Sequence, residues 1–173
     1  MSLDKSSEIE KLSTRLGANV YTANAKISNT PNHDLGIIYF QKPVKVVGLH
    51  TENKHPAAPV VISKRNFKEH AQPGKLAMLV NSGCANACTG KRGIDGCKKT
   101  VDHLANKLEL KSCSVFPSST GEILKFLSEE RMLRGIDLAL ENKSSWGWVG
   151  AFWGIDTEPL RGILYKRHQY IIG

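Results

Sequence analysis

Short apolar runs of strand length dominate the first half of the chain. They predict strands at 34–40, 44–50, 59–63 and 76–81. The first run is rich in β-branched and aromatic residues, and turn-forming residues separate the runs from one another. Proline marks the predicted turn at 41–43, and a Pro-Gly pair marks the predicted turn at 72–74.

In the second half, apolar residues recur at spacings of three and four, which predicts a helix with one buried face. They are Ile94, Cys97, Val101, Leu104, Ala105 and Leu108. A strand is expected at 114–119, and Ser128 reads as the N-cap of a second helix. Glu129 and Glu130 follow it in the first turn, where the helix dipole favours acids. Strands, a helix, a strand and a helix predict an α/β (α+β) fold.

The chain divides into a polar lead-in and one domain. Residues 1–16 are predicted to be a flexible segment, and they lack the apolar core of a secretory signal. Residues 17–173 are predicted to form a single α/β domain. Its apolar stretches are too short to span a bilayer, so no membrane association is expected. We therefore expect a cytoplasmic protein, or an organelle matrix protein.

The 173 residues carry a net charge of +8, which raises the prospect of a nucleic-acid or anionic partner. The basic residues are scattered in pairs, and no aromatic residues alternate with them as a stacking surface requires. A solvated basic surface is therefore favoured over a nucleic-acid site. Attraction of an acidic small substrate remains an alternative.

Cysteine spacing argues against a metal. Cys84, Cys88, Cys97 and Cys113 form no close pair of ligands of the zinc-site kind. We expect no metal and interpret the cysteines as small apolar core residues.

Two loops carry candidate chemistry. Residues 81–93 read N-S-G-C-A-N-A-C-T-G-K-R-G, without any large apolar side chain, between a predicted strand and a predicted helix. Such a loop lets backbone approach a ligand closely, or it is a tight turn that binds nothing, and both remain open. Residues 118–122 read S-S-T-G-E, a turn whose N–H groups can face an oxyanion. A nucleophilic Ser118 or Ser119 is disfavoured, because neither lies in a G-x-S-x-G elbow.

Together these segments resemble the N-terminal half of the ornithine acetyltransferases (glutamate N-acetyltransferases). Residues 34–35 resemble the family's D-L-A-L strand, and residues 50–53 with 57–60 resemble its F-T-x-N and A-A-P-V segments. Residues 119–121 with Ile123 resemble S-T-G-V-I-G, and residues 156–159 resemble the end of T-T-D-T-x-P-K. The most specific match is to N-S-G-x-A-N-A-x-T-G-x-x-G, through Asn81, Ser82, Gly83, Asn86, Thr89 and Gly90.

The resemblance implies a mixed sheet packed with helices, which is incomplete without the C-terminal half. Family members cut themselves into an α and a β chain, and the new N-terminal threonine of the β chain carries acetyl from N-acetylornithine to glutamate. That threonine's own amine can act as the base. Some members accept acetyl-CoA, and none needs a cofactor. The resemblance implies that Thr120 and Gly121 form the oxyanion hole and that Asp156 and Thr157 bind substrate.

Departures from the family pattern leave three hypotheses open. Gly154 and Ile155 replace paired threonines, Glu122 replaces a valine beside the oxyanion turn, and the cleavage segment is absent. The chain is therefore an α-chain-like part that works with a separate β chain, an inactive or truncated relative, or a basic nucleic-acid-binding module. Under the first two, open strand edges predict a hetero-oligomer or self-association.

Overall fold

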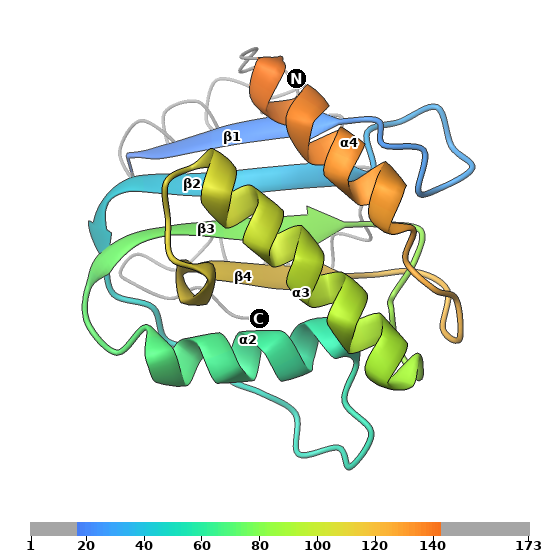
Figure 1. Ribbon diagram of the computed structural model, residues 1–173, viewed down its shortest axis with the longest axis horizontal. Coiled ribbons are helices and arrows are strands. Elements are labelled where there is room, and N and C mark those ends of the chain that lie inside the picture. Colours follow the sequence, from blue (N-terminus) through green and yellow to red (C-terminus); the bar gives the residue numbers. More distant parts are fainter. Residues whose placement is uncertain (1–16, 143–173) are drawn as a thin grey trace, which may run out of the picture.

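The computed structural model describes residues 17–142, which form a four-stranded sheet packed with helices (Figure 1). The strands are β1 (Ala18–Ala23), β2 (Leu35–Val44), β3 (Gly74–Asn81) and β4 (Val115–Ser119). The helices are α2 (Ala58–Glu69), α3 (Gly90–Lys107) and α4 (Glu129–Glu141), and a 3-10 turn, η1 (Ser112–Ser114), precedes β4. The strand order is β1-β2-β3-β4. The first three strands are antiparallel, and β3 and β4 are parallel, so the predicted α/β class with a mixed sheet is confirmed.

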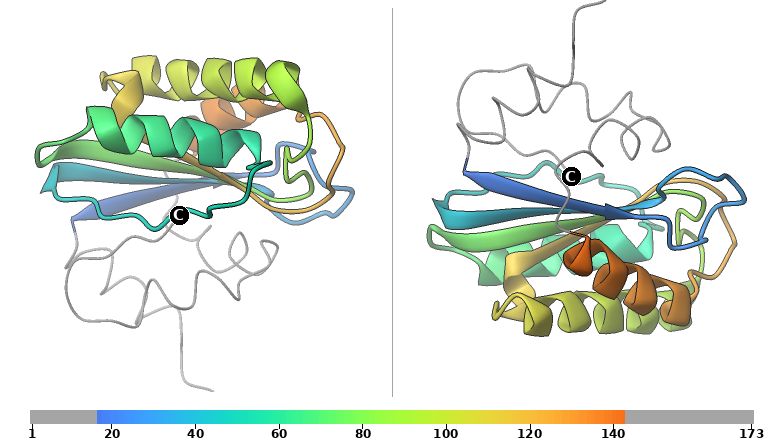
Figure 2. Two further views of the ribbon diagram at one scale, coloured as in Figure 1. Left: turned by 90° about the horizontal axis from the view of Figure 1, so that it is seen from below. Right: turned by 90° about the horizontal axis from the view of Figure 1, so that it is seen from above.

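All three helices lie on one side of the sheet (Figure 2). Strand alternation sends Ile37 and Leu79 toward them, into one core cluster, while Phe40 and Met78 belong to a second cluster on the opposite side. Burial of each such side chain contributes about 1.5–3 kcal/mol.

Helix α3 is the crossover between the parallel strands β3 and β4. Its predicted apolar stripe is confirmed, since Cys97, Val101 and Leu104 are fully buried. Parallel strands end at the same edge of a sheet, and they require such a crossover. The segments that follow β3 and β4 therefore meet, although more than thirty residues separate them in the sequence.

The predicted strand at 59–63 is wrong, because these residues lie in helix α2. Pro59 stands in the first turn, where a missing N–H costs nothing. Ala58, Ile62 and Asn66 are buried at spacings of four. The Asn66 amide donates to the carbonyl of Val115 at 2.7 Å, which fixes α2 against β4.

The predicted turn at 41–43 and strand at 44–50 are also wrong. Strand β2 continues through residues 41–43 to Val44, with a shift of register after Phe40. Residues 45–50 form neither helix nor strand. Strand β1, which pairs with β2, was not predicted.

Helix α4 begins as predicted. Ser128 accepts a hydrogen bond from the Arg131 N–H at 3.4 Å, and Glu129 and Glu130 occupy the first turn. None of the helices within residues 17–142 is long and apolar enough to cross a membrane.

Candidate functional site

Asn81, the last residue of β3, joins the loop after β3 to the turn after β4. Its buried side chain accepts from the Ser119 hydroxyl at 2.7 Å and donates to the Cys84 carbonyl at 3.0 Å. Its own carbonyl accepts from the Thr120 N–H at 2.9 Å. One residue therefore fixes the spacing of both candidate segments.

Gly83 and Gly121 bring the two segments into backbone contact. Both have positive φ, of 86° and 122°, which favours glycine. A Cβ on Gly121 would lie 2.5 Å from the Gly83 carbonyl carbon and 2.6 Å from the Cys84 nitrogen. Beside this contact, the Ala85 N–H donates to the Glu122 carbonyl at 3.0 Å. Neither glycine tolerates a side chain without movement of the turn.

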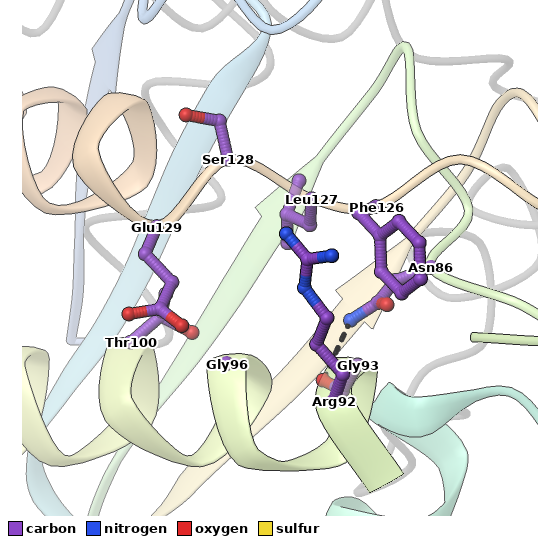
Figure 3. Close-up of a pocket in the computed structure, with 9 residues that line it drawn as sticks. All are labelled: Asn86, Arg92, Gly93, Gly96, Thr100, Phe126, Leu127, Ser128 and Glu129. Carbon is purple, nitrogen blue, oxygen red and sulfur yellow. Dashed lines mark hydrogen bonds between the residues drawn. The ribbon is translucent and has the colours of Figure 1, made fainter. Parts of the chain in front are cut away.

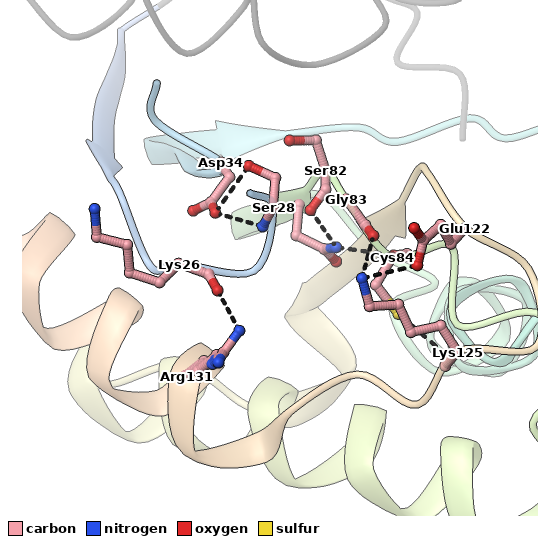
Figure 4. A network of polar contacts seen from close by, with 10 residues as sticks. Lys26, Ser28, Asp34, Ser82, Gly83, Cys84, Glu122, Lys125 and Arg131 are labelled. Atoms are coloured by element: carbon pink, nitrogen blue, oxygen red, sulfur yellow. Dashed lines mark hydrogen bonds and ion pairs between the residues drawn. The ribbon is translucent and has the colours of Figure 1, made fainter. Parts of the chain in front are cut away.

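A third loop supports Gly83 from the other side, and Asp34 organises it (Figure 4). The buried Asp34 carboxylate accepts from the N–H groups of Ala25 and Ile27 at 2.6 Å and of Ser28 at 2.8 Å. A Cβ on Gly83 would lie 2.8 Å from the Ser28 Cα. From the sequence, Asp34 was assigned only to the predicted strand at 34–40 and to a family segment, and an acid directly before an apolar run was the one signal of this role.

The turn at Thr120 and Gly121 has three hydrogen-bond donors, namely the two backbone N–H groups and the Thr120 hydroxyl. The Thr120 N–H is occupied by Asn81, so it cannot face a ligand. Within residues 17–142, neither the Thr120 hydroxyl nor the Gly121 N–H has a hydrogen-bond partner, and Gly121 is exposed. Of the donors expected at this turn, a hydroxyl and one N–H are thus available to an oxyanion.

Glu122 forms an ion pair with Lys125. Its carboxylate lies 2.8 Å from the Lys125 ammonium, and its side chain is 70% exposed. The same ammonium lies 3.5 Å from the Gly83 carbonyl oxygen (Figure 4). The charge that departs from the family pattern therefore has a counter-ion.

The rest of the loop after β3 binds mainly to itself. The buried Asn86 amide donates to the Gly93 carbonyl at 3.1 Å, and the Thr89 hydroxyl donates to the Asn86 side chain at 2.8 Å. Gly90 starts α3 with a φ of 59°. These bonds favour a tight strand-to-helix turn over a ligand loop for this part of the motif.

A hollow of about 420 Å³ lies between α3 and the start of α4 (Figure 3). The Arg92 guanidinium lies 4.3 Å from the centre of the Phe126 ring at its edge. The lining residues are Asn86, Arg92, Gly93, Gly96, Thr100 and 126–129. Thr120 and Gly121 are absent from that lining, so the hollow is separate from the turn, and the sequence did not point to it.

Two of the four cysteines fit the core interpretation, Cys113 is only partly buried, and Cys88 does not fit it. Cys84 and Cys97 are buried, but Cys88 is exposed, because it lies at the tip of the loop with a φ of 58°. Burial raises the pKa of Cys97 to about 12 and also raises that of Cys84. Neither buried thiol suits a nucleophile. Within residues 17–142, no three histidine, cysteine or acidic side chains are arranged to hold a metal.

Asp156 and Thr157, expected to bind substrate, lie outside the described residues, as do Gly154 and Ile155.

Comparison with known proteins agrees with this geometry. The sequence profile of the ArgJ family matches residues 18–159. The chain is 34% identical over 136 residues to the mitochondrial arginine biosynthesis bifunctional protein ArgJ of Heterostelium pallidum, which covers 79% of this chain and 31% of that protein. It is 37% identical over 125 residues to the ArgJ of Caldanaerobacter subterraneus, which covers 72% of this chain and 30% of that one.

The fold is similar to a solved ornithine acetyltransferase from Mycobacterium tuberculosis, in complex with ornithine. The TM-score is 0.71 at 27% identity, over 80% of this chain and 75% of that one. The chain belongs to the ArgJ family. It spans less than a third of the length of the two ArgJ relatives above.

Proposed function

We propose that this chain is the α-chain-like, N-terminal part of an arginine-biosynthesis N-acetyltransferase. The Thr120 hydroxyl and the Gly121 N–H hold the carbonyl oxygen of the acetyl group as it becomes an oxyanion. A separate β chain supplies the threonine nucleophile, which takes acetyl from N-acetylornithine and gives it to glutamate. The first half of this cycle leaves ornithine and an acetyl-threonine ester, and the second leaves N-acetylglutamate.

The arrangement of the turn carries the proposal. Asn81 and Gly83 hold it on one side, and the bridge from Cys84 to Glu122 holds it on the other. Donors that do not move during the reaction are the ones that stabilise developing charge most. The ornithine bound to the Mycobacterium tuberculosis relative supports an amino-acid substrate.

The loop after the turn supports a partner chain. Ile123 and Leu124 are 64% and 73% exposed, and Phe126 is half-exposed beside them. Exposed apolar side chains in a row suit burial against another chain. The match covers less than a third of each of these ArgJ relatives, which is consistent with a further chain that completes the protein.

The test is acetyl transfer from N-acetylornithine to glutamate, with this chain alone and with a family β chain. We expect activity only in the mixture. Thr120→Val keeps the shape and removes the hydroxyl, so kcat should fall about 10²–10³-fold. Thr120→Ser keeps the hydroxyl and should retain most of the activity.

Two results would contradict this proposal and favour another function. If the two chains co-purify without any activity, the chain is an inactive relative that keeps the fold. If the chain instead binds DNA with an affinity that falls steeply with salt, the basic nucleic-acid-binding module is favoured. Acetyl-CoA in place of N-acetylornithine tests the alternative acetyl donor in the same assay.

A further inference from the structure

A carboxylate next to an oxyanion hole opposes the charge that develops there. Glu122 directly follows Gly121, and its main chain is fixed by the bridge to Cys84. The acid therefore cannot leave the neighbourhood of the turn by a backbone shift. An unpaired negative charge roughly 7 Å away weakens an oxyanion interaction about threefold even in water, and more at shorter distances or where water is excluded.

We propose that Lys125 is a positioning residue that cancels the Glu122 charge and so keeps the Gly121 N–H an effective donor. The inference rests on the proposed oxyanion role of Gly121. The Lys125 ammonium lies 2.8 Å from the Glu122 carboxylate and 3.5 Å from the Gly83 carbonyl oxygen. It thus contacts both segments that form the turn.

The backbone also holds Lys125 in place, which separates this pair from an ordinary surface ion pair. The Lys125 carbonyl accepts from the buried Cys84 thiol at 3.2 Å, and its side chain is only 39% exposed. By contrast, Lys91 pairs with Asp95 along α3 at 3.0 Å with a side chain 90% exposed. Exposed pairs of that kind contribute little and are screened by salt.

Hydrogen exchange of the Gly121 N–H tests the inference without any acetyl transfer. Exchange of an exposed amide near neutral pH is catalysed by hydroxide and passes through an imidate anion, so a nearby negative charge slows it. In the full 173-residue chain, NMR should show Lys125→Met slowing the Gly121 exchange about threefold. Glu122→Val combined with Lys125→Met should restore the original rate.

The sign of the change separates the two roles of Lys125. If the lysine only braced the loop, its loss would loosen the turn and leave the exchange of this exposed N–H unchanged or faster, because the N–H has no hydrogen bond to break within residues 17–142. Lys91→Met removes the same charge from the distant pair and should leave the Gly121 rate unchanged. Faster or unchanged exchange in Lys125→Met, or an equal effect of Lys91→Met, overturns the inference.

Activity with a β chain provides the second arm. Lys125→Met should lower kcat with little change in KM, because the charge acts on the transition state, and the double variant should recover it. If the exchange pattern holds while no combination of chains is active, the electrostatic inference stands and the proposed acetyltransferase activity fails. If the wild-type mixture is active and Lys125→Met is equally active, the inference fails alone.

Discussion

At the scale of single residues, the candidate site was predictable only as far as motifs reach. Thr120, Gly121 and Asn81 were identified through their resemblance to family segments, and the structure places them together. Lys125 contacts Gly83, which is distant in the sequence, so no local pattern could assign that contact. The Asp34 contacts lie within one loop, but they depend on the path of its backbone, which no motif specified.

Leu124 is strained in a way that a substitution can relieve. Its φ of 63° lies in the left-handed region, where glycine stands in the family segment S-T-G-V-I-G, and its side chain is 73% exposed. Leu124→Gly should raise the free energy of unfolding by about 0.5–1 kcal/mol, measured by urea denaturation. Leu124→Ala keeps the strain and should give no gain, and equal stabilisation by both variants would contradict this explanation.

Asp34 should matter more for stability than any exposed acid. Asp34→Ala leaves three N–H groups without their acceptor, and we expect a loss of about 3 kcal/mol or more in the free energy of unfolding. Asp34→Asn keeps one acceptor oxygen and should lose less. Exposed Asp95→Asn serves as the control within about 0.5 kcal/mol. Equal losses in the Asp34 and Asp95 variants would show that the loop at 24–34 is held by other contacts.

At the scale of elements, periodicity succeeded where it was long and failed where it was short. The stripe along α3 extends over several turns, so it identified the helix. In α2, the β-branched run at 60–62 favoured a strand in the prediction from sequence. The helical spacing of Ala58, Ile62 and Asn66 is evident only from their burial, and the Asn66 amide bonds to β4. The edge strand β1 reads A-N-V-Y-T-A and has only two large apolar side chains, Val20 and Tyr21, so it did not stand out.

The N-cap of α4 gives a test at this scale. Ser128→Ala removes the acceptor for the Arg131 N–H and should cost about 1 kcal/mol, measured by thermal or urea unfolding. Ser128→Asp keeps an acceptor and adds a favourable charge at the helix start, so it should be neutral or stabilising. A loss in Ser128→Asp as large as in Ser128→Ala would argue against capping.

At the scale of the whole molecule, the stability of the fold depends on pH through two partly buried histidines. Burial lowers the pKa of His70, and burial together with the Lys64 charge lowers that of His50, both from 6.5. The unfolded chain thus binds these protons more readily, and stability rises with pH.

We therefore expect the free energy of unfolding to be highest above pH 6.5 and to fall as the pH drops toward 5. Urea denaturation at pH 7 and pH 5 measures this difference. His50→Gln combined with His70→Gln should reduce it, because the two titrations are removed. An unchanged difference in that variant would contradict this assignment. Asp137 cannot account for the difference, because desolvation raises its pKa but the Lys107 and His103 contacts lower it further, below the usual 3.8, and the carboxyl stays ionised from pH 5 to pH 7.

The exposed loop after the turn predicts self-association of the isolated chain. Sedimentation of the wild type should show mass that increases with concentration. Ile123→Ser with Phe126→Ser should lower that mass, whereas Val47→Ser, a half-exposed apolar residue elsewhere, should not. A compact monomer at every concentration would rule out association through this loop.

The parallel pairing of β3 and β4 also sets when the site can form during folding. Asn81 and Ser119 meet only after the whole of α3 has closed the crossover between them, and closing such a long loop is slow compared with forming a helix or a hairpin. The antiparallel pairing of β2 and β3 spans a connection of similar length, which contains α2, but it does not involve β4. We therefore expect a nascent chain that has not yet emerged beyond β4 to contain most of the sheet but not the turn at Gly121.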